Sequence, residues 1–188
     1  MTFSKQIKAD NNFFKSNIEI LEVRNPVDNS FVKTKPLELS NLKTLILQID
    51  NLSQDNFAKI CNLNLPALEY LKLDCAWDIE SDDIIPIVLG KLSPNLIYLG
   101  IKGHADTVLE YLNQSPLKEN LKILNLSYGH LKSLDNIDLS ESSILNRLHT
   151  LNVSHNELRS RMLDELSNLK CRVIDYYQEI SVFDMCIE

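Results

Sequence analysis

The stretch RLHTLNVSHNEL, residues 147–158, carries apolar side chains at positions 1, 4, 6 and 11 when it is counted from Leu148. Those side chains belong to Leu148, Leu151, Val153 and Leu158, and position 9 is Asn156. A helix repeats every 3.6 residues and a strand alternates with a period of two, so neither pattern fits the whole stretch. The spacing indicates a short strand followed by a corner.

The same spacing recurs along the chain at intervals of 23 to 28 residues. Positions 1, 4 and 6 are held by Leu42, Leu45 and Leu47, by Leu68, Leu71 and Leu73, by Leu96, Leu99 and Ile101, and by Leu121, Leu124 and Leu126. An earlier copy has Ile18, Leu21 and Val23, and a degraded last copy has Cys171, Ile174 and Tyr176. Even spacing of this kind predicts an array of stacked units.

Each position of the repeat has a physical role in such a unit. Positions 4 and 6 point inward from a parallel strand, because alternate side chains share a face. The side chain at position 1 packs into the core just before the strand, and the side chain at position 11 packs into the core again after the corner. An asparagine at position 9 can bond the backbone groups that the bend leaves unpaired. Because position 9 of the other copies is Asp50, Ala76, His104 and Gly129, their corners need other partners.

The copies resemble leucine-rich repeats, whose core pattern L-x-x-L-x-L-x-x-N/C-x-L recurs every 20 to 29 residues. Four return segments read as helices: SQDNFAKICNL, SDDIIPIVLGKL, DTVLEYLNQ and SRMLDELSNL. The return after Val23 contains two prolines and is expected to be extended, and the return after Leu131 is a weak helix candidate. Helical returns resemble the ribonuclease-inhibitor-like branch, and the last copies resemble bacterial cytosolic leucine-rich-repeat proteins without a defined role.

We therefore expect an α/β fold, a curved solenoid of about six to seven repeats with a parallel concave sheet and a mostly helical convex side. The whole chain, 1–188, is expected to be one domain with an N-terminal cap at 1–16, repeats at 17–170, and a final strand and cap at 171–188. Some secreted leucine-rich-repeat proteins seal a cap with a disulfide, which here would join Cys171 and Cys186. A reducing compartment argues against that bridge.

The composition excludes several classes of protein. The chain has 188 residues, a net charge of −7 and only 19 basic residues, which are scattered rather than gathered in the stripe that nucleic acids or acidic membranes require. No stretch approaches the roughly 20 apolar residues of a membrane span, and no signal peptide is apparent. Four cysteines show no CxxC pair. These features favour a cytoplasmic protein without membrane or nucleic-acid partners.

The sequence gives no positive sign of catalysis, a cofactor or a metal. No serine occupies a nucleophile elbow, and the 4 glycines form no phosphate loop. The acidic run between Asp74 and Asp83 lacks the glycine and closing glutamate of a calcium loop. His104 and His130 lie near position 9 of adjacent copies, so an enzyme that uses this pair is retained as an alternative.

The candidate binding residues lie at positions 3, 5 and 7, which face away from the core. Tyr70 and Tyr98 share position 3 of neighbouring copies and are expected to be exposed interface anchors, or else a cross-strand pair that only stabilises the sheet. Trp77 is either an anchor at the rim or packed under the next helix. The full predicted concave site is Ile46, Tyr70, Lys72, Asp74, Tyr98, Lys102, Ile123, Asn125 and Asn152.

These residues predict a non-enzymatic protein-protein interaction module, monomeric alone, that binds a partner on its concave sheet. The first alternative is an inhibitor or immunity-type protein that covers a basic partner site with its acidic surface. The enzyme that uses His104 and His130 is the second alternative, and a structural segment of a larger assembly is the third.

Overall fold

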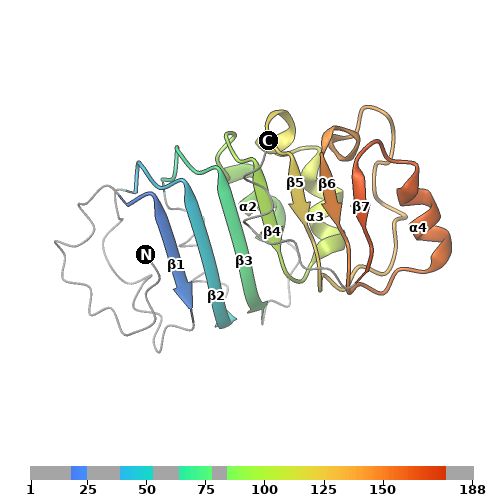
Figure 1. The fold of residues 1–188 in the computed structure, drawn as a ribbon, viewed down its shortest axis with the longest axis horizontal. Helices are drawn as coiled ribbons and strands as arrows, with labels where there is room; N and C mark the ends of the chain where they lie inside the picture. The colour runs from blue at the N-terminus through green and yellow to red at the C-terminus, as the bar shows by residue number, and fades with distance from the viewer. Residues whose placement is uncertain (1–17, 25–38, 53–63, 78–83, 177–188) are drawn as a thin grey trace.

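The computed structural model describes residues 18–24, 39–52, 64–77 and 84–176. Its seven strands form one sheet in chain order, and each neighbouring pair is parallel (Figure 1). The strands are β1 (Ile20–Arg24), β2 (Thr44–Leu52), β3 (Tyr70–Trp77), β4 (Tyr98–Ile101), β5 (Ile123–Asn125), β6 (Thr150–Asn152) and β7 (Arg172–Ile174). This open, curved parallel sheet is that of a leucine-rich-repeat solenoid.

The predicted inward leucines lie in one continuous row across the sheet. The register pairs position 4 of each of the first six copies with position 4 of the next, in the order Leu21, Leu45, Leu71, Leu99, Leu124 and Leu151, and the row ends at Val173 of β7. A second row joins position 6 of the first four copies, Val23, Leu47, Leu73 and Ile101. Burying each leucine contributes roughly 2 kcal/mol relative to exposure. The prediction of one continuous core is confirmed.

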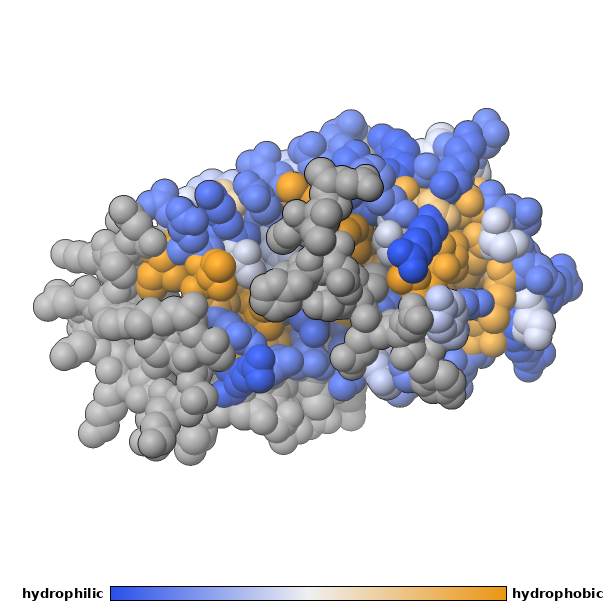
Figure 2. All heavy atoms as spheres, in the orientation of Figure 1, coloured by the Kyte–Doolittle hydropathy of each residue, from blue (hydrophilic) through white to orange (hydrophobic). Residues whose placement is uncertain are grey.

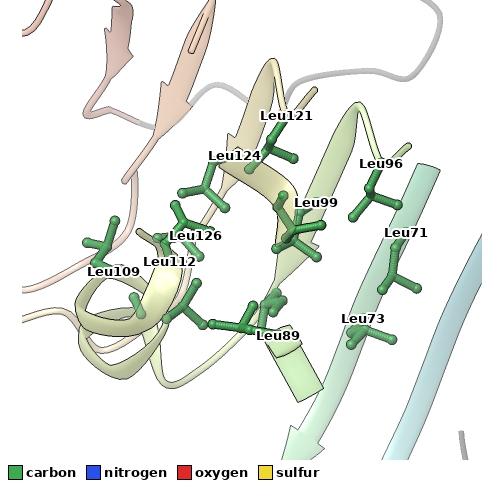
Figure 3. Close-up of a cluster of buried hydrophobic side chains, with 14 of the residues drawn as sticks. Leu71, Leu73, Leu89, Leu96, Leu99, Leu109, Leu112, Leu121, Leu124 and Leu126 are labelled. Carbon is green, nitrogen blue, oxygen red and sulfur yellow. The ribbon is translucent and has the colours of Figure 1, made fainter. Parts of the chain in front are cut away.

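In the described parts of the return segments lie three helices and two short 3-10 helices: α2 (Ile84–Lys91), α3 (Ala105–Leu112), α4 (Ser160–Ser167), η3 (Pro116–Glu119) and η4 (Ile144–Arg147). Helices α2 and α3 lie behind the sheet (Figure 1). Leu89, Leu109 and Leu112 from these helices belong to the same buried cluster as the leucines of β3 to β5 (Figure 3). The predictions of helices here and of Pro86 in a first helical turn are confirmed.

The return after Leu131 contains no α-helix and ends in η4. Its short polar side chains bond to the nearby backbone instead: Ser140 N–H donates to Asp138 Oδ1 at 2.9 Å, and Asp135 N–H donates to Ser133 Oγ at 3.0 Å. Such local bonds compete with helix formation. The expected extended return at 25–38, the helix at 53–63, the cap at 1–16 and Cys186 lie outside the described residues, as does the side chain of Trp77.

The last strand differs from the prediction by one residue. Half-buried Val173, not Ile174, pairs with Leu151 and packs against the core, whereas Ile174 pairs with Asn152 and is nonetheless buried, with 4% exposed. A shift of one residue exchanges the two faces of a strand. Tyr176, expected to point inward, is therefore 50% exposed.

Candidate functional site

The concave face is formed by two rows of outward residues. The register places Thr44, Tyr70, Tyr98, Ile123 and Thr150 side by side at position 3, and Ile46, Lys72, Gly100, Asn125 and Asn152 side by side at position 5. Figure 2 shows hydrophobic side chains at the β1 end of the face and again at the β7 end, with hydrophilic residues along the edge where the strands begin. The predicted site residues therefore share one face.

Tyr70 and Tyr98 stack with their ring centroids 4.0 Å apart and an angle of 6° between the rings. They are only 9% and 3% exposed, so the prediction of exposed anchors is wrong. The Tyr98 ring lies over Gly100, where an added Cβ would be 3.0 Å from the phenol oxygen. That oxygen accepts a hydrogen bond from Asn125 Nδ2 at 3.2 Å. Since Gly100 lets the ring lie along the sheet, the pair matches the alternative of a cross-strand pair.

Burial raises the pKa of Tyr70 far above its usual value, and Tyr98 adds to this rise. Burial also raises the pKa of Tyr98, against a smaller lowering by hydrogen bonds with Tyr70 and Asn125. The phenols of an unfolded chain ionise near pH 10, as roughly expected for free tyrosine. Above that pH the unfolded chain binds fewer protons than the folded chain, so this contribution to stability is present at lower pH and is lost as the pH rises.

We therefore expect the free energy of unfolding to fall more steeply above about pH 10 in the parent chain than in a Tyr70→Phe, Tyr98→Phe double variant. Both chains keep the same lysines, so the difference in slope isolates the tyrosine pair. Urea denaturation at a series of alkaline pH values measures it. Equal slopes would show that the pair ionises in the folded protein as it does in the unfolded chain.

Asn152 is 1% exposed, and its predicted role as a direct partner contact is not compatible with that burial. Its Oδ1 accepts from Ser154 N–H at 2.9 Å, and Asn125 Oδ1 likewise accepts from Ser127 N–H at 3.0 Å. Both asparagines therefore use their short side chains to turn the chain at the end of a strand. The Asn152 Nδ2 group has no hydrogen-bond partner among the residues that the structure describes.

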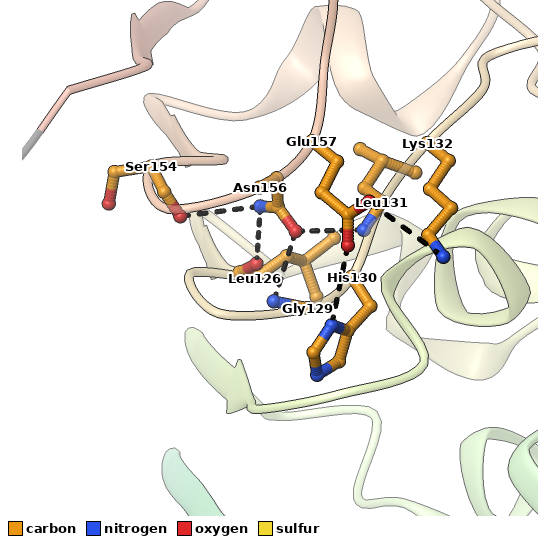
Figure 4. A network of polar contacts seen from close by, with 8 residues as sticks. All are labelled: Leu126, Gly129, His130, Leu131, Lys132, Ser154, Asn156 and Glu157. Atoms are coloured by element: carbon orange, nitrogen blue, oxygen red, sulfur yellow. Dashed lines mark hydrogen bonds and ion pairs between the residues drawn. The ribbon is translucent and has the colours of Figure 1, made fainter.

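The corner after β6 follows the prediction for position 9. Asn156 Oδ1 accepts from Gly129 N–H at 3.0 Å and from Leu131 N–H at 2.9 Å (Figure 4). Its Nδ2 donates to the carbonyls of Leu126 and Val153 at 2.9 and 2.8 Å, with a longer bond to Ser154. One amide thus bonds the corners of two adjacent repeats, as the sequence predicts.

Other corners are bonded by the backbone of the next repeat. Gly103 N–H donates to the Tyr128 carbonyl at 3.1 Å, and Tyr128 N–H donates to the Ser154 carbonyl at 3.2 Å. Ala105 N–H donates to the Gly129 carbonyl at 3.0 Å. Consecutive corners therefore stack on each other and form a fixed rim at the carboxyl ends of the strands.

A pocket of about 390 Å³ opens at this rim. It is lined by side chains from four consecutive repeats: Lys72 and Asp74 from β3, Lys102 after β4, Asn125, Ser127 and Tyr128 from β5 and its corner, and Ser154 and His155 from the corner after β6. The volume lies near the lower end of the roughly 300 to 1,000 Å³ range of ligand pockets. Four of the predicted site residues, Lys72, Asp74, Lys102 and Asn125, are brought together here.

The two lysines of the pocket have different surroundings. Lys102 Nζ lies 3.4 Å from Asp74 Oδ1 and 5.4 Å from the centroid of the Tyr128 ring. Lys72 is half-buried opposite Gly100 and makes no ion pair or hydrogen bond within the described residues. Lys72 is thus a partly desolvated cation that lines the pocket, and no carboxylate of the described residues forms an ion pair with it.

One wall of the pocket is an aromatic stack that the sequence did not predict. The rings of Tyr128 and His155 lie 4.1 Å apart, and the Tyr128 oxygen is 3.2 Å from His155 Nε2. Both residues have left-handed backbones, with φ of 58° and 55°, at the repeat position where the preceding copy has Gly103 with φ of 80°. Non-glycine residues rarely adopt this conformation. The sequence does contain one sign of this stack, because Tyr128 and His155 both occupy position 8 of consecutive copies.

The remaining candidates do not form a second site in the described part of the chain. His130 Nδ1 lies 3.7 Å from Glu157 and its side chain is 79% exposed. Among the residues that the structure describes, no group of three histidine, cysteine or acidic side chains is arranged to hold a metal ion. Across those same ranges, no helix has the length and apolar character needed to cross a bilayer.

No model of a known protein family and no curated protein matches the sequence. Among solved structures, a Bacteroides fragilis protein from a structural genomics consortium aligns with a TM-score of 0.58 and 25% identity, over 77% of this chain and 45% of its own. A Listeria monocytogenes internalin aligns with a TM-score of 0.49 and 18% identity, over 85% and 41%. The chain thus spans less than half the length of either protein.

Proposed function

We propose that the protein is a non-enzymatic binding module that holds a partner protein against the carboxyl-end rim of its concave sheet. The observation that carries this proposal is the rim pocket, because four consecutive repeats each contribute side chains to it. A partner that enters the pocket contacts residues separated by more than 80 positions in sequence but held together by one sheet.

Rigidity is the proposed mechanism of recognition. Lys102 forms an ion pair with Asp74 and lies over the Tyr128 ring, which in turn stacks on His155. Because these contacts already fix the side chains, they lose little conformational freedom when a partner binds. Tyr128 is 42% exposed and takes the anchor role that the sequence assigned to Tyr70 and Tyr98. Half-buried Ile46 and Ile123 supply apolar contact beside the pocket. The buried tyrosine pair and Asn152 form the support beneath the proposed surface.

The inhibitor alternative rests on the net charge of −7. The rim pocket itself contains two lysines and one aspartate, so a partner with a basic site would bind elsewhere on the molecule. The cytoplasmic location, the monomeric state and the ribonuclease-inhibitor-like type stay predictions. The helical returns α2, α3 and α4 support the last of these.

Site-specific photo-cross-linking tests the proposed function. A photoreactive amino acid is placed at Ile123 or Ser127 on the concave face, or at the exposed control positions Glu110 on α3 and Asp164 on α4. We expect a discrete protein adduct in a lysate of the source cells from the concave positions alone. The same adduct from the control positions, or adducts from none, would contradict the proposal.

A further inference from the structure

The rim pocket has an unusual charge for this protein. The chain as a whole carries −7, but the pocket contains Lys72, Lys102 and a single carboxylate from Asp74, which leaves one net positive charge when His155 is neutral. A cation in a partly desolvated pocket attracts an anion more strongly than one on an open surface. The charge of the pocket therefore selects for a negatively charged group.

Lys72 and Lys102 differ in how far a neighbouring carboxylate already neutralises their charge. Asp74 already lies 3.4 Å from Lys102 and neutralises part of its charge. Lys72 lies opposite Gly100, which has no side chain to bond it, and it makes no ion pair among the described residues. Burial of a charge is costly unless it is paired, so an anion that reaches Lys72 would remove this cost.

The neutral groups of the pocket suit an oxygen-rich ligand. Ser127 and Tyr128 bring hydroxyl groups to the wall, and the stacked ring of His155 fixes the Tyr128 ring. Hydrogen bonds from hydroxyls and ammonium groups to a charged oxygen are stronger than those between neutral groups. The pocket thus offers several donors in addition to its charge.

We propose that this pocket binds a single carboxylate side chain, glutamate or aspartate, from an acidic segment of the partner, an inference that rests on the proposed function. The carboxylate lies against Lys72 and Lys102 and accepts hydrogen bonds from the hydroxyls of Ser127 and Tyr128, and the Tyr128 oxygen then accepts a hydrogen bond from His155 Nε2–H. One carboxylate balances the net charge of the pocket. A phosphate dianion would leave one negative charge unbalanced beside Asp74, so the carboxylate is favoured.

The test is an NMR titration of the full chain with the blocked tripeptide acetyl-Gly-Glu-Gly-amide. We expect saturable shifts of the backbone amides of Lys72, Lys102, Ser127 and Tyr128. The Lys72→Gln, Lys102→Gln double variant should raise the apparent Kd about tenfold, since each lysine makes a charge-assisted bond. The control Lys43→Gln, Lys170→Gln removes the same charge from exposed lysines that pair with Glu19 and Glu141, and its Kd should match the parent chain.

Four outcomes would overturn the inference. Two concern the peptide and the variants: equal shifts with the matching tripeptide acetyl-Gly-Gln-Gly-amide, or an equal loss of affinity in the control variant. The other two concern the occupant: tighter binding of inorganic phosphate than of the Glu peptide, or shifts of the same amides with protein concentration alone, which would indicate a second copy of the chain. Cross-linking from Ile123, which contributes no group to the carboxylate site, does not depend on this titration. If the titration fails while cross-linking succeeds, the proposed protein-binding function stands and the proposed carboxylate site is refuted.

Discussion

Replacing Asn156 with alanine is expected to lower the free energy of unfolding by about 3 to 5 kcal/mol, because each buried polar group that loses its partner costs roughly 1 to 3 kcal/mol. The Asn156 amide accepts from the backbone N–H groups of Gly129 and Leu131 and donates to the carbonyls of Leu126 and Val153. An alanine leaves all four groups unbonded at a rim where corners are stacked.

Two further variants make this expectation specific. Asn156→Asp keeps the acceptor toward Gly129 and Leu131 but loses the donor and places a charge against two carbonyls, so it should also destabilise the chain. Asn168→Ala removes a single exposed bond to the Asp164 carbonyl and should cost less than about 1 kcal/mol. Urea denaturation of the three variants measures the differences. If Asn156→Ala costs no more than Asn168→Ala, the corner does not depend on the amide.

The core and this corner could be predicted because they follow from local chemistry that repeats. Leucines at positions 4 and 6 must share a face in any parallel strand, and the register places them in one row. Asn156 was predictable because its side chain carries both a donor and an acceptor beside a bend. Neither inference needs knowledge of distant residues.

The exposure of Tyr70 and Tyr98 could not be predicted in the same way. Position 3 fixes the direction of the Cα–Cβ bond but not the torsions that lay the ring along the sheet. The Tyr98 ring depends on Gly100 two residues later and on Asn125 of the next strand. The sequence contains all three residues, but a contact between a ring and an empty glycine position has no periodic signal.

The rim pocket was predicted only in part, because its wall depends on backbone conformation. Lys72, Asp74 and Lys102 lie on strand positions, and periodicity places them. Tyr128 and His155 reach the pocket from corners where their backbones are left-handed. This conformation costs a residue with a Cβ roughly 1 to 2 kcal/mol. The hydrogen bond from Tyr128 N–H to Ser154 and the ring stack accompany that strained conformation.

Gly129 tests how closely the corners are packed, since a Cβ added there would meet three neighbouring residues. A Cβ at this residue would lie 2.3 Å from Ala105 Cβ, 2.7 Å from the Leu126 carbonyl oxygen and 3.1 Å from Asn156 Oδ1. Such contacts force the first residue of α3 away from the corner and break the bond from Ala105 N–H to the Gly129 carbonyl. We expect Gly129→Ala to cost about 3 kcal/mol or more, at the upper end of overpacking effects.

A double-mutant cycle separates this close approach from a general effect of replacing glycine. Ala105→Gly alone should cost about 1 to 2 kcal/mol, from the helix propensity of glycine and the loss of a buried methyl group. In the Ala105→Gly, Gly129→Ala double variant the closest clash is removed, so the total loss should be smaller than that of Gly129→Ala alone, although the Leu126 carbonyl still lies too near for full recovery. Additive losses in urea denaturation would show that α3 and the corner do not touch at Gly129, and that the rim which holds Tyr128 in the pocket is less rigid than the proposed binding mechanism requires.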